Sequence, residues 1–226
     1  MIYFDKVSKI YPNNTTALSD VTFTIRPKEF ISFVGHSGAG KTTVIKMILG
    51  EEVPTKGSVF FESVNIHNLQ KDAITDYRRR IGTVFQDFRL LPNLTVYENV
   101  AFAMEACGRD DEEIAADVPH VLELVGLVNK MTSFPHELSG GEKQRVAIAR
   151  AIVNQPDVVI ADEPTGNLDP VSTHEIVEIL KKINDLGTTV ILTTHNKGVV
   201  DFVKSRVITM EEGKVVRDDK QGKYSL

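Results

Sequence analysis

The sequence predicts an α/β fold with a mostly parallel sheet. Short apolar runs rich in β-branched residues, at 31–34, 81–85 and 158–161, alternate with longer segments of helical periodicity. Near the start, residues 21–25 alternate between apolar and polar, which is typical of a half-buried antiparallel strand. We therefore expect an N-terminal antiparallel β subdomain and a core of parallel strands covered by helices.

The middle of the chain predicts helices only. Strand signals stop at about residue 88, and helical patterns run through 95–106 and 110–125, where Pro119 predicts a kink. Strand and helix signals then resume with the run at 158–161 and an apolar strand at 189–193. The predicted organisation is one domain over 1–226, with an α/β core at 1–87 and 136–226 and an inserted helical lobe at 88–135.

The charge balance argues against a nucleic-acid partner. The chain has 26 basic and 31 acidic residues, a formal net charge of −5. A protein that wraps a phosphate backbone needs a basic footprint, and this composition supplies none. We expect no nucleic-acid binding.

Neither a membrane span nor a secretion signal is predicted. No uninterrupted apolar run approaches the ~20 residues that cross a bilayer, and the N-terminus lacks the pattern of a signal peptide. Cys107 is the only cysteine, so no internal disulfide can form, and a reducing compartment fits. If the protein acts at a membrane, a partner must hold it there.

A glycine-rich loop connects the strand at 31–34 to an apolar helical run. Glycines let backbone N–H groups point inward at phosphate oxygens, and the following helix N-terminus adds its positive dipole end. Lys41 would reach the β and γ phosphates, and Thr42 would ligate Mg²⁺. This pattern indicates a P-loop NTPase core that binds ATP with Mg²⁺ through Gly35, His36, Ser37, Gly38, Ala39, Gly40, Lys41, Thr42 and Thr43.

Two carboxylates follow the apolar strand at 158–161. A P-loop enzyme needs an acid at such a strand end to hold Mg²⁺, and Asp162 fits this role. Glu163 is placed to polarise the attacking water as a general base. A solvated turn is the alternative interpretation.

Residues 138–142, Leu-Ser-Gly-Gly-Glu, precede a predicted helix. Ser139 and Glu142 have the spacing of a capping box, so an ordinary helix start is one interpretation. Two glycines in a first turn nevertheless cost about 1 kcal/mol each relative to alanine, and they expose backbone amides at the positive end of a helix dipole. We interpret Ser139, Gly140, Gly141 and Glu142 as a second phosphate-binding surface.

These segments together resemble the nucleotide-binding domains of ABC ATPases, and the resemblance covers nearly the whole chain. Residues 35–42 resemble the Walker A motif, and residues 158–162 resemble Walker B, with Glu163 in the catalytic position. Residues 138–142 resemble the family signature, and 167–169 resemble its D-loop, which implies a nucleotide contact for Asp169.

The resemblance also assigns roles to residues that would otherwise attract no attention. It implies that Gln86 senses Mg²⁺ and the attacking water, that His195 contacts the γ-phosphate, and that the ring of Tyr11 stacks on adenine. With Lys41 and Glu163, Gln86 and His195 complete the expected catalytic set. Asn196 departs from the family, which usually has Asp there, so this chain lacks the carboxylate charge that the family has beside the histidine.

The resemblance further implies a head-to-tail homodimer that forms in the presence of ATP. In this family the nucleotide lies between the P-loop of one copy and the signature segment of the other. Contacts of the γ-phosphate favour the closed dimer, and hydrolysis removes them. A single chain is expected to be nearly inactive.

Within the family, four segments resemble the bacterial cell-division ATPases. That resemblance implies an integral membrane partner of the FtsX type, peptidoglycan hydrolases activated indirectly through it, and a peripheral location on the cytoplasmic face of the cell membrane. Residues 88–91 would dock the partner; packing within the lobe is the alternative. The four segments are 35–41, in which His36 is the most telling residue, 79–82, 85–91 and 213–218.

Other functions stay open at this point. One is the ATPase of a lipoprotein-releasing or macrolide-exporting system. Another is a soluble ABC protein of DNA repair or translation, although the second domain or basic insertion typical of those proteins does not appear in this sequence. A third is a non-catalytic scaffold, which would be expected to lose Lys41 or Glu163.

Overall fold

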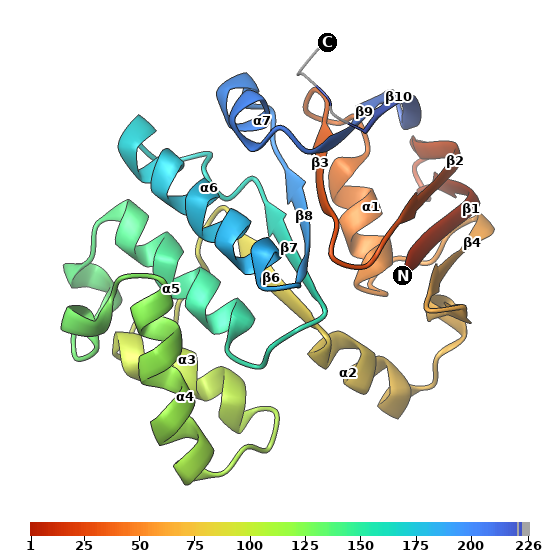
Figure 1. Cartoon of the computed structure of the whole chain (residues 1–226). Helices are drawn as coiled ribbons and strands as arrows, with labels where there is room; N and C mark the ends of the chain where they lie inside the picture. Colours follow the sequence, from red (N-terminus) through yellow and green to blue (C-terminus); the bar gives the residue numbers. More distant parts are fainter. Residues whose placement is uncertain (221, 223–226) are drawn as a thin grey trace. The chain divides into compact units, whose positions relative to one another are not determined.

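The computed structural model describes residues 1–220 and 222, and it confirms the α/β class (Figure 1). Its contacts divide the chain into two compact units. Unit 1 comprises Met1–Arg78 and the chain from Thr189 onward, and unit 2 comprises Arg79–Thr188. The segment predicted as a helical lobe, 88–135, lies within unit 2, which also contains strands.

Unit 1 begins with an antiparallel sheet, as residues 21–25 predicted. Its strand order is β2-β1-β4-β5. Phe4 of β1 opposes Phe23 of β2, and their rings stack 4.5 Å apart on the buried face of the sheet. Phe23 also meets Phe33 at 5.3 Å, which joins this sheet to the next one. The strands are β1 (Ile2–Ile10), β2 (Thr16–Ile25), β4 (Lys56–Phe61) and β5 (Val64–Asn65).

The second sheet of unit 1 is built around β3 (Phe30–Val34). This strand is buried along its whole length and runs parallel to β8 (Thr189–Thr193) on one side and β9 (Arg206–Glu211) on the other. Burial on both faces explains why all its residues except Ser32 are apolar. The remaining elements are α1 (Lys41–Ile48), η1 (Ile66–Asn68), α2 (Lys71–Arg79), α7 (Lys197–Val203) and β10 (Lys214–Asp219), which pairs antiparallel with β9.

Unit 2 contains the parallel pair β6 (Ile81–Phe85) and β7 (Val158–Asp162). Three of its helices, α3, α4 and α5, pack against one another, as the green and yellow-green part of Figure 1 shows. The helices expected at 95–106 and 110–125 are present, and Pro119 lies inside α4. The helices are α3 (Val96–Glu105), α4 (Asp111–Leu124), η2 (Val128–Lys130), η3 (Pro135–Glu137), α5 (Gly140–Ile152) and α6 (Pro170–Asp185).

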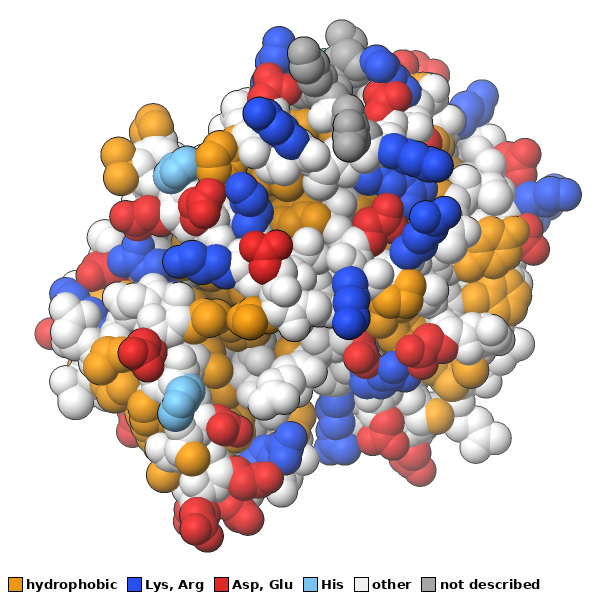
Figure 2. Space-filling model, in the orientation of Figure 1, with side chains coloured by type: hydrophobic (Ala, Val, Ile, Leu, Met, Phe, Trp, Pro, Cys, Tyr) orange, Lys and Arg blue, Asp and Glu red, His pale blue; other side chains and the backbone are white. Residues whose placement is uncertain are grey.

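The surface mixes both signs of charge. On the face drawn in Figure 2, Lys and Arg side chains are interspersed with Asp and Glu, and apolar side chains lie between them. Among the described residues, no helix is long and apolar enough to cross a membrane.

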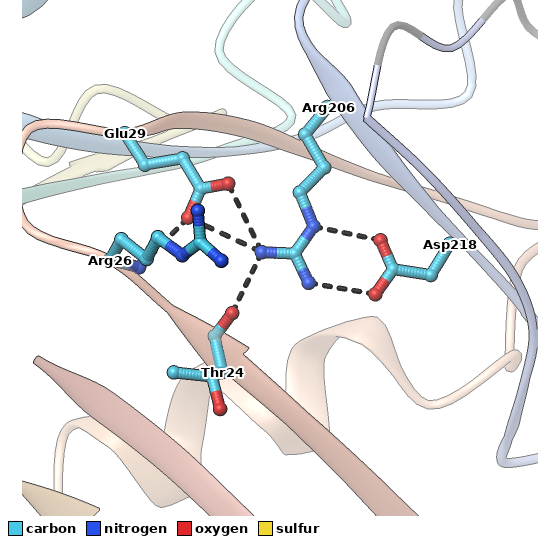
Figure 3. Close-up of polar contacts among 5 residues, drawn as sticks. All are labelled: Thr24, Arg26, Glu29, Arg206 and Asp218. Atoms are coloured by element: carbon cyan, nitrogen blue, oxygen red, sulfur yellow. Dashed lines mark hydrogen bonds and ion pairs between the residues drawn. The ribbon is translucent and has the colours of Figure 1, made fainter.

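A partly buried arginine anchors the C-terminal hairpin to the first sheet of unit 1 (Figure 3). Arg206 of β9 donates from Nε and Nη2 to both carboxylate oxygens of Asp218, each at 2.7 Å. Its Nη1 donates to the Thr24 carbonyl oxygen at 2.7 Å and to Glu29 at 3.1 Å. The hydrogen bonds that Arg206 donates to Asp218 raise the pKa of Arg206 above its usual value, so the guanidinium is always charged.

Arg206→Met should therefore destabilise the protein, because it leaves two carboxylates facing each other without their shared cation. We expect a loss of about 2 kcal/mol in the free energy of unfolding, measured from urea denaturation midpoints. Arg217→Met is the matched control on the same hairpin, since the Arg217 pair with Asp219 is 53% exposed on the arginine side and should be worth less than about 1 kcal/mol. Equal losses for the two variants would contradict the anchoring role.

Candidate functional site

The glycine-rich loop of unit 1 is shaped by close backbone approach. It leaves β3 at Gly35 and ends at Gly40, the N-cap of α1, with φ +105°. A Cβ at Gly35 would lie 2.3 Å from the Met210 carbonyl oxygen, and one at Gly40 would lie 2.8 Å from that of Ala17. Both glycines are therefore required by the neighbouring strands, independently of any ligand.

The outer part of the loop faces open space. Gly38 has φ +81°, and a Cβ built on it would meet no atom within 4 Å. Ser37, Gly38 and Thr42 are exposed, and the first turn of α1 has no acidic residue. A helix N-terminus without a carboxylate, preceded by an open loop, fits a phosphate group, and the Thr42 hydroxyl fits a Mg²⁺ ligand.

Lys41 is buried against this loop. Its Nζ donates to the carbonyl oxygens of Gly35 at 2.7 Å and His36 at 3.1 Å. Neutral carbonyls orient the ammonium but do not cancel its charge. A phosphate bound at the loop would supply the missing negative charge.

His195 lies at the same edge of the sheet as the loop. β8 is parallel to β3, with Phe33 opposite Thr193, so both strands end on one side. His195 follows β8 and is exposed. Asn196 then caps α7, because its Oδ1 accepts from Val199 N at 3.4 Å. Asn can make this bond as Asp does, which explains how the chain tolerates the departure from the family pattern.

The ring of Tyr11 lies close to the positively charged side chain of Lys9. Lys9 Nζ is 5.2 Å from the centroid of the ring and is itself held by Glu52 at 2.7 Å and by the Val53 carbonyl at 2.8 Å. The backbone of Tyr11 is fixed in a turn by hydrogen bonds with Asn14 and Thr15. One face of the ring is thereby occupied by a cation.

In unit 2, the strands β6 and β7 bring a second group of candidates together. Phe85 and Asp162 are opposite one another in parallel register, so Gln86 and Glu163 leave the sheet side by side. Gln86 Nε2 donates to Asn167 Oδ1 at 3.4 Å. Glu163 has φ +49°, a strained conformation of the kind that often occurs at functional sites.

The signature segment forms a capping box at the start of α5. Ser139 N donates to Glu142 Oε2 at 2.8 Å, and Glu142 N donates to Ser139 Oγ at 3.2 Å. The backbone bond from Ser139 lowers the pKa of Glu142 below its usual value, so the carboxylate is ionised at neutral pH. A Cβ at Gly141 would meet Ser172 Oγ at 2.7 Å, so packing against α6 also demands this glycine. The helix-start interpretation is confirmed, and phosphate binding by this segment remains a prediction.

Asp169 likewise has a structural role. It is the N-cap of α6 and accepts from the backbone of Val171 at 2.9 Å and Ser172 at 3.0 Å. The Ser172 hydroxyl also donates to it, at 2.5 Å, and lowers the pKa of the carboxyl. The D-loop residue is thus fixed by its own helix.

The structure groups the sequence-predicted residues in two sets, one in each unit. Unit 1 contains Tyr11, the loop from Gly35 to Thr43 and His195, whereas unit 2 contains Gln86, Asp162, Glu163, Asp169 and residues 139–142. Neither Lys9 nor Asn167 was predicted from the sequence. Their side-chain contacts, with Tyr11, Glu52 and the Val53 carbonyl oxygen for Lys9 and with Gln86 for Asn167, leave no periodic pattern.

Comparison with known proteins places these motifs in a family. The profile described as ABC transporter matches residues 18–166. Proteins named cell division ATP-binding protein FtsE are similar over nearly the whole chain. The one from Bacillus subtilis (strain 168) is 53% identical and covers 99% of this chain and 98% of its own length. The one from Escherichia coli (strain K12) is 43% identical and covers 94% and 96%, respectively.

Solved structures with a similar fold indicate the same family. A dimeric post-hydrolysis state of the ATP-binding cassette MJ0796 bound to ADP and Pi has a TM-score of 0.88 at 36% identity and covers 99% of this chain and 100% of that one. The structure of cbiO1 from Clostridium perfringens has a TM-score of 0.90 at 31% identity, with coverage of 97% and 88%. The chain belongs to the ABC transporter family, as an ATP-binding cassette ATPase.

Proposed function

We propose that this chain is the ATPase subunit of a bacterial cell-division complex. In this proposal it drives an integral membrane protein of the FtsX type, which activates peptidoglycan hydrolases, and it is held at the cytoplasmic face of the membrane by that partner. The observation that carries the proposal is the 53% identity to an FtsE protein over 224 residues. The matched region covers 99% of this chain.

In the proposed site, unit 1 binds the nucleotide. Lys41 and the amides of the loop 35–42 hold the β and γ phosphates, and His195 contacts the γ-phosphate from the neighbouring strand end. Tyr11 stacks on adenine with the face of its ring that Lys9 leaves free. Support comes from the ammonium of Lys41, which donates to neutral carbonyl oxygens of the loop, and from the open space beside Gly38.

Unit 2 contributes the hydrolytic groups. Asp162 and Gln86 are proposed ligands of Mg²⁺, which when bound would offset charge on the phosphate oxygens. Glu163 accepts a proton from the attacking water, and Gln86 helps to orient that water. The parallel register of Phe85 with Asp162 supports this division of roles. Because of it, the carboxylates of Asp162 and Glu163 and the amide of Gln86 lie at the carboxyl ends of two neighbouring strands.

The proposed active form is a head-to-tail homodimer. Ser139, Gly140, Gly141 and Glu142 of one copy would complete the phosphate site of the other, and Asp169 would line the interface. The capping box leaves the Ser139 hydroxyl hydrogen able to donate to a phosphate while its oxygen accepts from Glu142 N. The dimeric state of the MJ0796 cassette, solved with ADP and Pi, supports this assembly.

Glu163→Gln tests the enzymatic part of this proposal. Replacing the general base should lower kcat by about 10² to 10⁴ and leave KM for ATP nearly unchanged, because the nucleotide is held mainly by unit 1. Steady-state phosphate release at saturating Mg²⁺ and ATP measures both constants. Glu123→Gln, an exposed carboxylate on α4, is the control and should behave as wild type. A Glu163→Gln variant with unchanged kcat would remove Glu163 from the mechanism.

The partner is tested by affinity purification from detergent-solubilised membranes of the source cells, with ATP present and the Glu163→Gln variant as bait. We expect this variant to recover an FtsX-type membrane protein, because ATP that is not hydrolysed keeps the dimer closed. Lys41→Ala, which should not hold ATP, is the matched bait and should recover less. Recovery of a permease that transports a solute would reject the cell-division role and leave the ATPase intact.

A further inference from the structure

The segment that follows Gln86 has an unfavourable backbone. Phe88 has φ +59° and Arg89 has φ +49°, so two successive residues with a Cβ adopt the left-handed conformation. Neither is Gly, Asn or Asp, the types that tolerate this region best. Local hydrogen bonds from Phe88 N to Phe85 O and from Arg89 N to Asp87 O close the turn. Such a turn persists only where its surroundings hold it.

Arg150, in the last turn of α5, supplies that support. Its Nη1 donates to the Arg89 carbonyl oxygen at 2.6 Å and its Nη2 to that of Phe88 at 2.9 Å. The guanidinium therefore bridges the carbonyls of the two strained residues. A planar fork of N–H groups is suited to this task, since its geometry fixes two acceptors at once.

A second side chain of α5 reaches the same segment. Gln144 is fully buried, and its Nε2 donates to the Phe85 carbonyl oxygen at 3.4 Å. Its Oε1 is also buried and has no hydrogen-bond partner among the described residues. A displaced segment that brought a backbone N–H to this oxygen would gain a hydrogen bond. That additional hydrogen bond would stabilise a second arrangement of the turn against α5.

Beyond the turn, α3 holds the chain in a similar way. Asn99 is completely buried; its Oδ1 accepts from Leu91 N at 2.8 Å, and its Nδ2 donates to the carbonyl oxygens of Leu91 at 3.1 Å and Leu94 at 2.9 Å. Residues 85–94 are therefore bound by polar side chains of two packed helices. A displacement of this segment would therefore displace α3 and α5 as well.

The other end of α5 carries the signature residue Ser139. The helix runs without a break from Gly140 to Ile152, so Ser139 and Arg150 are separated by about 16 Å of continuous helix. An α-helix of this length transmits a displacement as a rigid element. The turn at Phe88 and Arg89 and the signature residue Ser139 are therefore attached to opposite ends of the same helix, α5.

We propose that Arg150 is a positioning residue that locks the turn at Phe88 and Arg89 to α5. Through it, displacement of residues 86–91 by a docking membrane protein shifts Ser139, and closure at Ser139 shifts Gln86. The lock itself follows from unit 2 alone, whereas its use in coupling rests on the proposed function.

Hydrogen exchange on the full chain tests the lock without nucleotide. In Arg150→Met, amide exchange within residues 86–91 should rise about tenfold or more, because the turn loses its charged donor, while exchange in β7 stays unchanged. Arg150→Lys should give an intermediate rise, since one ammonium replaces a planar fork. Arg109→Met, which removes an exposed pair with Glu113 on α4, is the matched control and should match wild type. Wild-type exchange at 86–91 in both Arg150 variants would overturn the proposal.

ATPase kinetics then test the coupling. Arg150→Lys should lower kcat about tenfold with KM for ATP within about twofold of wild type, because Gln86 and Ser139 act in turnover and the P-loop of unit 1 sets binding. A rise in KM with unchanged kcat would reject the coupling role. A wild-type chain without ATPase activity would reject the proposed function, and the exchange result would still decide whether the lock exists. If Arg150→Met does not fold, as judged by circular dichroism, the lysine variant decides both measurements.

Discussion

The constraint that organises this protein is the common direction of its buried parallel strands. In unit 1, β3 and β8 end at one edge, and the glycine loop and His195 follow them there. In unit 2, β6 and β7 end together, and Gln86 and Glu163 follow. The strands are buried on both faces, so their backbones are rigid, and the polar residues at their carboxyl ends are held at fixed separations. The chemistry therefore depends on hydrophobic burial several residues away.

Helix starts form the second recurring element. Gly40, Ser139, Asp169 and Asn196 are the N-caps of α1, α5, α6 and α7, and all four lie in segments that the family resemblance connects with nucleotide. A cap orients backbone amides and the positive end of a helix dipole, which is also what a phosphate requires. Structural and functional interpretations of these residues therefore agree. Asn196 shows the consequence: an amide replaces the usual carboxylate and still caps its helix.

The sequence predicted the structural elements that depend on a local pattern of residues. Apolar runs located β3, β6, β7 and β8, and the spacing of Ser139 and Glu142 predicted the capping box that the structure contains. Contacts to backbone carbonyls were not predictable. Arg150 and Lys9 bind carbonyl oxygens distant in sequence, Asn99 binds those of the irregular segment just before its helix, and any residue can offer a carbonyl. Arg206 was missed for a related reason, since Asp218 becomes its neighbour only when β9 and β10 pair, and Glu29 lies far from it in the sequence.

The central claim is that one copy's Lys41 and another copy's Ser139 act on the same ATP. Mixing two inactive variants, Lys41→Ala and Ser139→Phe, tests it most directly. If the site is shared, a mixed dimer contains one intact site, and an equimolar mixture should recover about a quarter of the wild-type ATPase rate while each variant alone stays near background. If each chain instead contains its own complete site, every site in the mixture carries a defect. The mixture would then show no more activity than the sum of the separate variants, which would contradict the account.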